Sequence, residues 1–250
     1  NLFEFHPETL AVPLLLWCAL EVRSGRAGRA ALAAGLALLA REDVPLPVLG
    51  LAAVALLARP RQPRIALTLT LLAISSLAFS FGILKPRLLA GQAEYGQMYA
   101  RWGSSPGAIV TGLCTHPLEA IASFWNTPGN PADSLTKQQY WLHLFLPVTG
   151  LSLLAPLWLL PALPVFTEHL LAERSHQHTI VFQYTALVLP FVIVAAVIGA
   201  RRLLSRSGAR PLAMVLLAVA ATTQVLFGPV VGRGVWMKAN SLGFDEIGAD

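Results

Sequence analysis

Residues 65–84 read IALTLTLLAISSLAFSFGIL, twenty consecutive residues without a charge. A helix of this length is about 30 Å long, which matches the hydrocarbon thickness of a bilayer. Two further runs, 179–200 and 211–231, are also uncharged and similarly long. Only 12% of the chain is charged and its mean hydropathy is +0.62, whereas soluble domains are about 25% charged. The sequence therefore predicts an all-α integral membrane protein.

Shorter apolar runs predict helices that pair as hairpins. A single helix over 30–58 would place the charged triplet 41–43 at mid-depth, at a cost of several kcal/mol per charge. We therefore expect two short helices that meet at a polar corner. Four prolines within 144–166 favour a second hairpin, which turns near Ala155–Pro156. Together with a first helix over 10–22, these elements predict a polytopic bundle of about eight transmembrane helices.

The stretch 85–143 is expected to be a long extracytoplasmic loop that contains an amphipathic helix. Residues 106–124 show a helical apolar pattern, and Ser104–Ser105 supply candidate N-caps before it. The mixed character of this helix predicts a position at the membrane interface. The chain begins without methionine and ends in the polar segment 241–250. We therefore expect residues 1–250 to be a single membrane domain from a longer protein.

Positive charge is segregated along the chain. Ten of the eighteen Lys and Arg residues lie in three breaks between apolar runs, at 23–29, 59–64 and 201–210. The eight-helix topology puts these breaks on one side, which the positive-inside rule makes cytoplasmic. All acidic residues except Glu21 then lie outside. The net charge of +5 does not indicate nucleic-acid binding, because the arginines flank apolar runs rather than form a basic stripe with aromatic residues.

Polar residues at the helix ends are expected to gather on the outer side. The adjacent carboxylates Glu42 and Asp43 could orient a substrate, hold a divalent metal or pair with a basic group, and a solvated corner paired with Arg41 is the alternative. A metal is compatible with these residues but is not required by them. His6 and Glu8 could bind a phosphate or hydroxyl group, or Glu8 could cap the first helix.

Other polar residues give weaker signals. Gln183 and Tyr184 lie one turn inside an apolar span, where they need hydrogen-bond partners from the bundle or from a substrate. His176 and His178 form a His-x-His pair, for which a polar interfacial turn is a better explanation than a metal site. The sequence contains no Walker loop, dinucleotide fingerprint, His-Glu-x-x-His or Gly-x-Ser-x-Gly motif. Nucleotide-driven transport and the standard hydrolases therefore have no support.

Several short motifs occur in a characteristic order. They are Phe5-His6-Pro7-Glu8, Arg41-Glu42-Asp43-Val44, Leu160-Pro161-Ala162-Leu163-Pro164, Gln183-Tyr184-Thr185-Ala186 and Pro190-Phe191. The ordered set resembles domain of unknown function 2079, a prokaryotic family of predicted multispanning membrane proteins grouped with the GT-C glycosyltransferases. The corner of that family more often reads Lys-Glu-Asp, and Arg41 keeps the positive charge.

This resemblance implies a GT-C-like bundle in the prokaryotic plasma membrane and transfer of a sugar from a polyprenyl-phosphate donor to an extracytoplasmic acceptor. It implies supporting roles for Glu42 and Asp43 in acceptor or metal binding, and for His6, Glu8 and Arg41 near the donor phosphate. The general base of such enzymes lies in an outer loop that we expect to precede this segment. The alternatives are a non-enzymatic transporter or flippase of lipid-linked or anionic solutes, and a structural scaffold.

Overall fold

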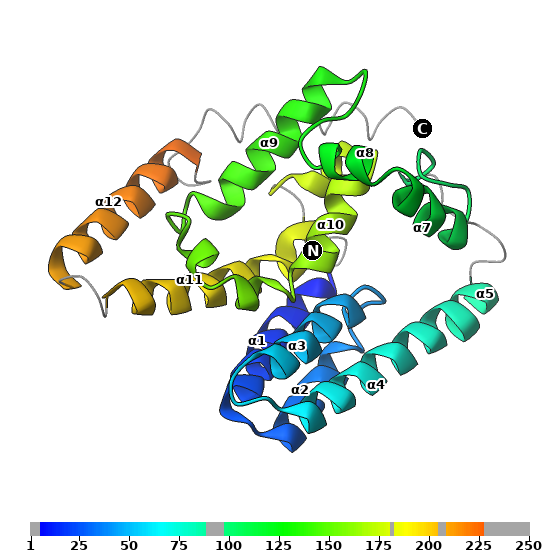
Figure 1. Ribbon diagram of the computed structural model, residues 1–250, viewed down its shortest axis with the longest axis horizontal. Coiled ribbons are helices and arrows are strands. Elements are labelled where there is room, and N and C mark those ends of the chain that lie inside the picture. Colours follow the sequence, from blue (N-terminus) through cyan, green and yellow to red (C-terminus); the bar gives the residue numbers. More distant parts are fainter. Residues whose placement is uncertain (1–5, 89–97, 181–182, 205–208, 228–250) are drawn as a thin grey trace.

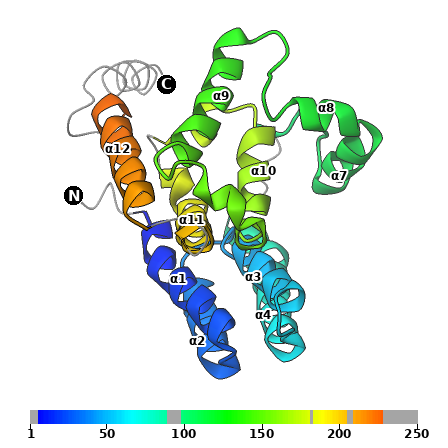
Figure 2. The same cartoon turned by 60° about the vertical axis from the view of Figure 1, so that its left-hand side comes forward.

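The computed structural model describes residues 6–88, 98–180, 183–204 and 209–227. These residues are largely helical and contain no strand, which confirms the all-α prediction (Figure 1). Helices α1 to α4 form a bundle at one end of the molecule, and the later helices lie above it (Figures 1 and 2).

The N-terminal bundle consists of two antiparallel helix pairs. Its helices are α1 (Glu8–Ser24), α2 (Ala27–Ala37), α3 (Pro45–Leu57) and α4 (Pro63–Phe79). Helix α1 packs against α2, α3 packs against α4, and α2 also contacts α4. The predicted short helices on either side of a polar corner are present as α2 and α3, but they do not pair with each other as the expected hairpin, because α2 packs against α1 and α4 while α3 packs against α4. Pro45 opens α3, where its missing amide hydrogen removes no helical hydrogen bond.

A tight turn at Gly25 joins α1 to α2. Gly25 has a φ of +73°, and its N–H donates to the carbonyl of Val22 while the N–H of Arg26 donates to the carbonyl of Glu21. This left-handed cap strains any residue with a Cβ atom. The turn lies at the same end of the bundle as the α3–α4 connection, so two of the three basic breaks share one end (Figures 1 and 2).

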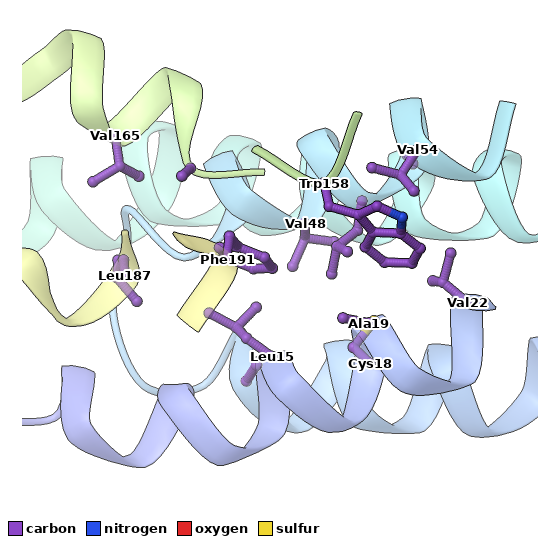
Figure 3. Close-up of a cluster of buried hydrophobic side chains, with 14 of the residues drawn as sticks. Leu15, Cys18, Ala19, Val22, Val48, Val54, Trp158, Val165, Leu187 and Phe191 are labelled. Carbon is purple, nitrogen blue, oxygen red and sulfur yellow. The ribbon is translucent and has the colours of Figure 1, made fainter. Parts of the chain in front are cut away.

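Small residues let the bundle helices approach closely. Ala30, Ala33, Ala34 and Ala37 form one fully buried face of α2. Such alanine-rich faces are typical of helix packing in membranes. The core then extends to later parts of the chain: Figure 3 shows Trp158 and Phe191 among side chains of α1 and α3.

One contact fixes the later chain against α3. A Cβ atom added to Gly50 would lie 2.3 Å from the Cα of Pro161 and 2.7 Å from the carbonyl oxygen of Leu160. Real Cβ atoms do not approach other atoms this closely, so glycine is required at this position. The contact places the segment before α10 (Leu163–Leu171) directly beside the helix that follows the polar corner.

Helix α4 continues through a π turn, Ser80–Leu84, into α5 (Lys85–Leu88). Residues 63–87 thus form a 25-residue helix with a mean hydropathy of 2.0 over its most apolar window, of which only 17% is buried. Within the described ranges this is the one helix long and apolar enough to cross a bilayer, so the expected eight crossings are not confirmed. Its exposed apolar side chains include Leu67, Leu71, Ile74, Phe79 and Phe81.

The expected interfacial helix over 106–124 is interrupted. It forms α7 (Pro106–Thr115) and α8 (Pro117–Ala122). His116 lies between them with φ −123° and ψ 55°, because a residue before proline is excluded from the α-helical region. The predicted N-cap is confirmed at Ser105, whose hydroxyl accepts a hydrogen bond from the N–H of Ala108. A further helix in the predicted loop, α9 (Pro131–Phe145), was not expected.

The proline-rich stretch 144–166 does not form the predicted hairpin. Two 3₁₀ turns, η3 (Leu151–Leu154) and η4 (Pro156–Leu159), follow each other before α10. Proline lacks an N–H donor and clashes with the preceding helical turn. The four closely spaced prolines therefore favour short turns over two continuous helices.

The last two helices also differ from the predicted spans. The run 179–200 first forms a 3₁₀ turn, η6 (Gln183–Leu187), and becomes helical in α11 (Leu189–Leu204). Helix α11 lies across the upper end of the α1–α4 bundle, and Figure 2 shows α11 nearly end-on. The last turn of α11, which carries Arg201 and Arg202, therefore does not lie at the end of the bundle with the other two basic breaks. Helix α12 is Ala209–Phe227. Residues 181–182 and 228–231 of these predicted spans, and residues 205–208 of the basic break between them, lie outside the described residues.

Candidate functional site

A pocket of about 190 Å³ lies between the polar corner and the upper half of α4. It is lined by Arg41, Glu42, Asp43, Leu46, Leu77, Phe81, Lys85 and Glu168. We call it the corner pocket. Leu77 and Phe81 lie about 21 and 27 Å along the helix axis from Pro63, at 1.5 Å per residue. The corner pocket is therefore at the end of the bundle opposite the two basic turns.

Ion pairs connect the helices around the corner pocket. The guanidinium of Arg41 donates to the carboxylate of Glu8 on α1, and its Nε lies 3.3 Å from Oδ2 of Asp43. Nζ of Lys85 lies 3.2 Å from Oε1 of Glu42. The contact between Glu8 and Arg41 thereby joins α1 to the corner across 33 positions of the chain. Four of the residues predicted to form a site, Glu8, Arg41, Glu42 and Asp43, are indeed brought together.

Much of this charge is removed from solvent. The Glu8 side chain is 4% exposed and that of Arg41 is 23% exposed. Oε2 of Glu8 and Oδ1 of Asp43 are buried and have no hydrogen-bond partner among the described residues. Buried polar atoms are normally satisfied, and the Asp43 oxygen lies at the corner pocket, where a water molecule or a ligand group with a donor would satisfy it.

Carboxylates outnumber cations around the corner pocket. Glu8, Glu42 and Asp43 each contact a cation, whereas Glu168 from α10 has no ion-pair contact among the described residues. Burial raises the pKa of Glu168 to about 7, and the negative charge of Asp43 adds to that effect while Arg41 opposes it. The Tyr99 hydroxyl donates a hydrogen bond to the backbone carbonyl of Glu168 at 3.3 Å.

A second polar cluster joins α9 to η5 (Ser175–His178). Nε2 of His178 lies 2.8 Å from Oδ1 of Asp133, and the hydroxyl of Thr127 donates to the other oxygen. Nζ of Lys137 lies 4.0 Å from Asp133 and donates to the carbonyl of Ser123 at 2.9 Å. Burial alone would raise the pKa of Asp133, but the hydrogen bonds from His178 and Thr127 hold it below its usual value.

Aromatic side chains extend this second cluster into α10. The hydroxyl of Tyr140 lies 2.9 Å from Nδ1 of His169, and the carbonyl of His169 lies 3.3 Å from Nδ1 of His178. The ring of Tyr184 meets that of His169 edge-on at 6.3 Å. Burial lowers the pKa of His169 to about 3, so it is neutral at physiological pH. The central side chains of the cluster, Asp133, His169 and His178, are almost completely buried, so their contacts hold α9, α10 and η5 together inside the protein.

The remaining predicted site residues lie outside the corner pocket. His6 contributes its carbonyl, which accepts hydrogen bonds from the N–H and the hydroxyl of Thr9 at the start of α1. Gln183 and Tyr184 lie in η6, which packs against α1, and Tyr184 faces the second cluster. The structure therefore separates these three residues from the corner pocket.

Sequence reasoning missed two residues of the corner pocket. Lys85 is the first charge after the uncharged run of α4, which is a recognisable signal for a cation at the end of a membrane helix. Glu168 was expected on the outer side, but nothing in the sequence pairs it with residues 41–43. His178 was predicted to lie in a polar interfacial turn; it does form a 3₁₀ turn, but its side chain is fully buried against Asp133.

Within the part of the chain that the structure describes, no three His, Cys, Asp or Glu side chains converge as a metal site would require. The described residues are helical, and the helix 63–87 is long and apolar enough to cross a bilayer. The family model described as "Predicted membrane protein (DUF2079)" matches residues 1–238, and the chain belongs to this family. No curated protein matches the chain. No solved structure matches it either.

Proposed function

We propose that this protein is a membrane-embedded glycosyltransferase that uses a polyprenyl-phosphate sugar on the extracytoplasmic side of the plasma membrane. The observation that carries the proposal is the composition of the corner pocket, where Arg41 and Lys85 lie next to an apolar wall. A lipid phosphate matches both parts of the pocket, because its anionic head suits the two cations and its apolar chain suits the apolar wall. The family resemblance of the corner motif supports the same assignment.

Most of the apolar wall belongs to the long apolar helix 63–87, of which only 17% of the most apolar window is buried. Leu77 and Phe81 of this helix form it together with Leu46 of α3, and Phe81 is 52% exposed. Nζ of Lys85 lies 4.3 Å from the centre of the Phe81 ring. A polyprenyl chain that lies along α4 would therefore bring its phosphate to Lys85 without crossing a polar surface. Burial of such a chain contributes about 0.8 kcal/mol per methylene group.

The two cations also suit the chemistry of transfer. When the acceptor oxygen attacks the anomeric carbon, the bond to the phosphate oxygen breaks and negative charge develops on the departing phosphate. Arg41 and Lys85 would stabilise this charge. Glu42 and Asp43 hold both cations in place by ion pairs, which is a supporting role. The general base remains unassigned within this chain.

Activity of the full-length protein in proteoliposomes tests the proposal. Polyprenyl-phosphate sugars with a radiolabelled sugar are supplied, and released polyprenyl phosphate and labelled acceptor are measured. We expect Lys85→Ala and the double change Glu42→Ala with Asp43→Ala to reduce transfer at least tenfold, corresponding to about 1.4 kcal/mol of transition-state stabilisation. Glu119→Gln, in an exposed ion pair outside the pocket, is the matched control and should retain wild-type transfer.

The same proteoliposomes distinguish the alternative function. A transporter or flippase would move the intact labelled lipid between leaflets without releasing polyprenyl phosphate. Movement without cleavage, or wild-type transfer by the Glu42 and Asp43 double variant, would overturn the proposal.

A further inference from the structure

We propose that Glu168 is the group in the corner pocket that donates a hydrogen bond to the phosphate of an anionic lipid. The inference rests on the proposed function and assigns a positioning residue to it. Nothing in the corner motif of the sequence indicates this role, because Glu168 lies about 125 residues after the motif, on a different helix.

The argument begins with the charges that an entering phosphate would meet. Arg41 is already engaged by Glu8 and Asp43, and Lys85 is engaged by Glu42. Each cation is therefore partly neutralised before a ligand arrives. With Glu168 ionised as well, the pocket would have an excess of negative charge, which opposes the binding of an anion.

Glu168 can relieve this excess without breaking an ion pair. It lines the pocket and, within the described ranges, makes no ion-pair contact of its own. When it takes up one proton, the carboxyl changes from a charged acceptor to a neutral group with one O–H donor. A protonated carboxyl beside a phosphate oxygen would then make a charge-assisted hydrogen bond.

The surroundings of Glu168 favour the protonated form near neutral pH. The titratable and charged groups around it come from several elements: Glu8 on α1, Arg41, Glu42 and Asp43 at the corner, Lys85 on α5, Tyr99 before α7, and His169 on α10. Burial, together with the carboxylates of Asp43 and Glu42, raises the pKa of Glu168 to about 7, while Arg41 and a hydrogen bond between Tyr99 and the Glu168 side chain act in the opposite direction. The proton that the proposal requires is therefore available under ordinary conditions.

Binding of a short-chain polyprenyl methyl phosphodiester to the detergent-purified full-length protein tests this role. The probe carries one negative charge throughout the range used and has no sugar to transfer, so it reports on the phosphate contact alone. Wild-type affinity should fall roughly tenfold between pH 6 and pH 8, because protonation of a group with a pKa near 7 falls by that factor.

Three variants make the result specific. Glu168→Gln supplies an uncharged N–H donor at every pH, so it should bind the probe with wild-type pH 6 affinity and without pH dependence. Glu168→Ala has no donor and should bind more weakly than Glu168→Gln at both pH values. Glu173→Gln removes the same charge from an exposed position on the same segment and should keep the wild-type pH dependence. A thermal melt of each variant checks that it is folded.

The outcomes separate this inference from the proposed function. If the wild-type protein binds the probe with equal affinity at pH 6 and pH 8, or if Glu168→Gln behaves like Glu168→Ala, the role of Glu168 is wrong while the phosphate site stands. If the wild-type protein fails to bind the probe at pH 6, the phosphate site itself is wrong.

Discussion

Nε2 of His178 lies 2.8 Å from Oδ1 of Asp133, although the two residues are 45 positions apart in the chain. The His178 side chain is 0% exposed and that of Asp133 is 3% exposed. The pair joins α9 to η5, and through His169 it also reaches α10, which carries Glu168. The part of the chain above the helical bundle is thus held by a buried polar contact that positions one wall of the corner pocket.

Loss of this contact should destabilise the protein. Asp133→Ala leaves His178, Lys137 and the hydroxyl of Thr127 without their partner, and breaking such a buried pair costs about 3–5 kcal/mol. Thermal unfolding of the detergent-solubilised protein measures the effect. Glu119→Ala, which removes a carboxylate from an exposed ion pair with Arg101, is expected to cost less than about 1 kcal/mol. Equal losses in both variants would contradict a structural role for the Asp133 contact.

Acid should weaken the same region. Burial lowers the pKa of His169 to about 3 in the folded protein, whereas its pKa in the unfolded chain is about 6.5. The contribution of His169 to the free energy of unfolding is therefore complete above about pH 6.5 and is lost progressively as the pH falls towards 3. The pKa of Asp133 is also below its usual value, so its contribution is present above about pH 4 and is lost as the pH falls through the folded pKa. Hydrogen exchange should show α9 amides opening faster at pH 4.5 than at pH 7, after correction for intrinsic rates. His169→Gln should reduce this difference.

Glu8 and Arg41 should be strongly coupled. Arg41→Ala leaves the buried Glu8 carboxylate without its cation and is expected to cost about 3 kcal/mol or more, whereas Glu8→Ala should cost less because Arg41 keeps its ion pair with Asp43. The double variant leaves neither charge and should cost clearly less than the sum of the two single changes. Unfolding free energies from a double-mutant cycle test this expectation. Additive losses would show that the two side chains do not act as a pair.

Substitution of Gly50 should disturb the site without touching a polar residue. The new Cβ atom of Gly50→Ala would meet the backbone of Leu160 and Pro161, which cannot rotate away. Overpacking of this kind costs about 1–3 kcal/mol. Gly35→Ala is the control, because nothing lies within 4 Å of a Cβ atom at that position. A melting temperature unchanged in Gly50→Ala would argue against the close contact between α3 and the segment before α10.

The expected orientation can be tested with native and introduced cysteines. Cys114 on α7 is exposed, whereas Cys18 on α1 is buried. A membrane-impermeant maleimide added to intact cells should label the wild-type protein at Cys114 and should not label Cys114→Ser. Ser24→Cys, in the exposed basic turn of the Cys114→Ser protein, should be labelled only after the membrane is opened. The opposite pattern would reverse the orientation.

The N-terminal bundle could be predicted from the sequence because its signals are local. Uncharged runs, the prolines that open α3 and α4, and Gly25 after α1 each act on their own segment. The region after residue 98 could not be predicted in the same way. The path of its proline-rich stretch depends on packing against α3, and α9 contains few apolar residues with a clear helical period.

The residues of the candidate site also fall into two groups, those that local sequence signals indicate and those that only tertiary packing brings to the site. Residues 41–43 could be found because charges between apolar runs are conspicuous, and Glu8 lies in a motif that the family resemblance had already marked. Lys85 and Glu168 could not be assigned to them, because each lies on a separate helix and joins the corner only through tertiary packing. The predicted topology put His6, Gln183 and Tyr184 at the same side of the membrane as the site. Residues on the same side of a membrane need not be in contact, and these three lie outside the corner pocket.

The π turn at Ser80–Leu84 has a consequence for how α4 presents its side chains. In a regular α-helix, residues 77, 81 and 85 would fan out around the axis by about 40° at each step of four residues. The wider turn winds more slowly and brings Lys85 back towards the line of Leu77 and Phe81. Two apolar groups and one cation thus lie in a row that ends at the corner. Deleting one residue from this turn would leave the helix as hydrophobic as before but would point its terminal charge away from Glu42.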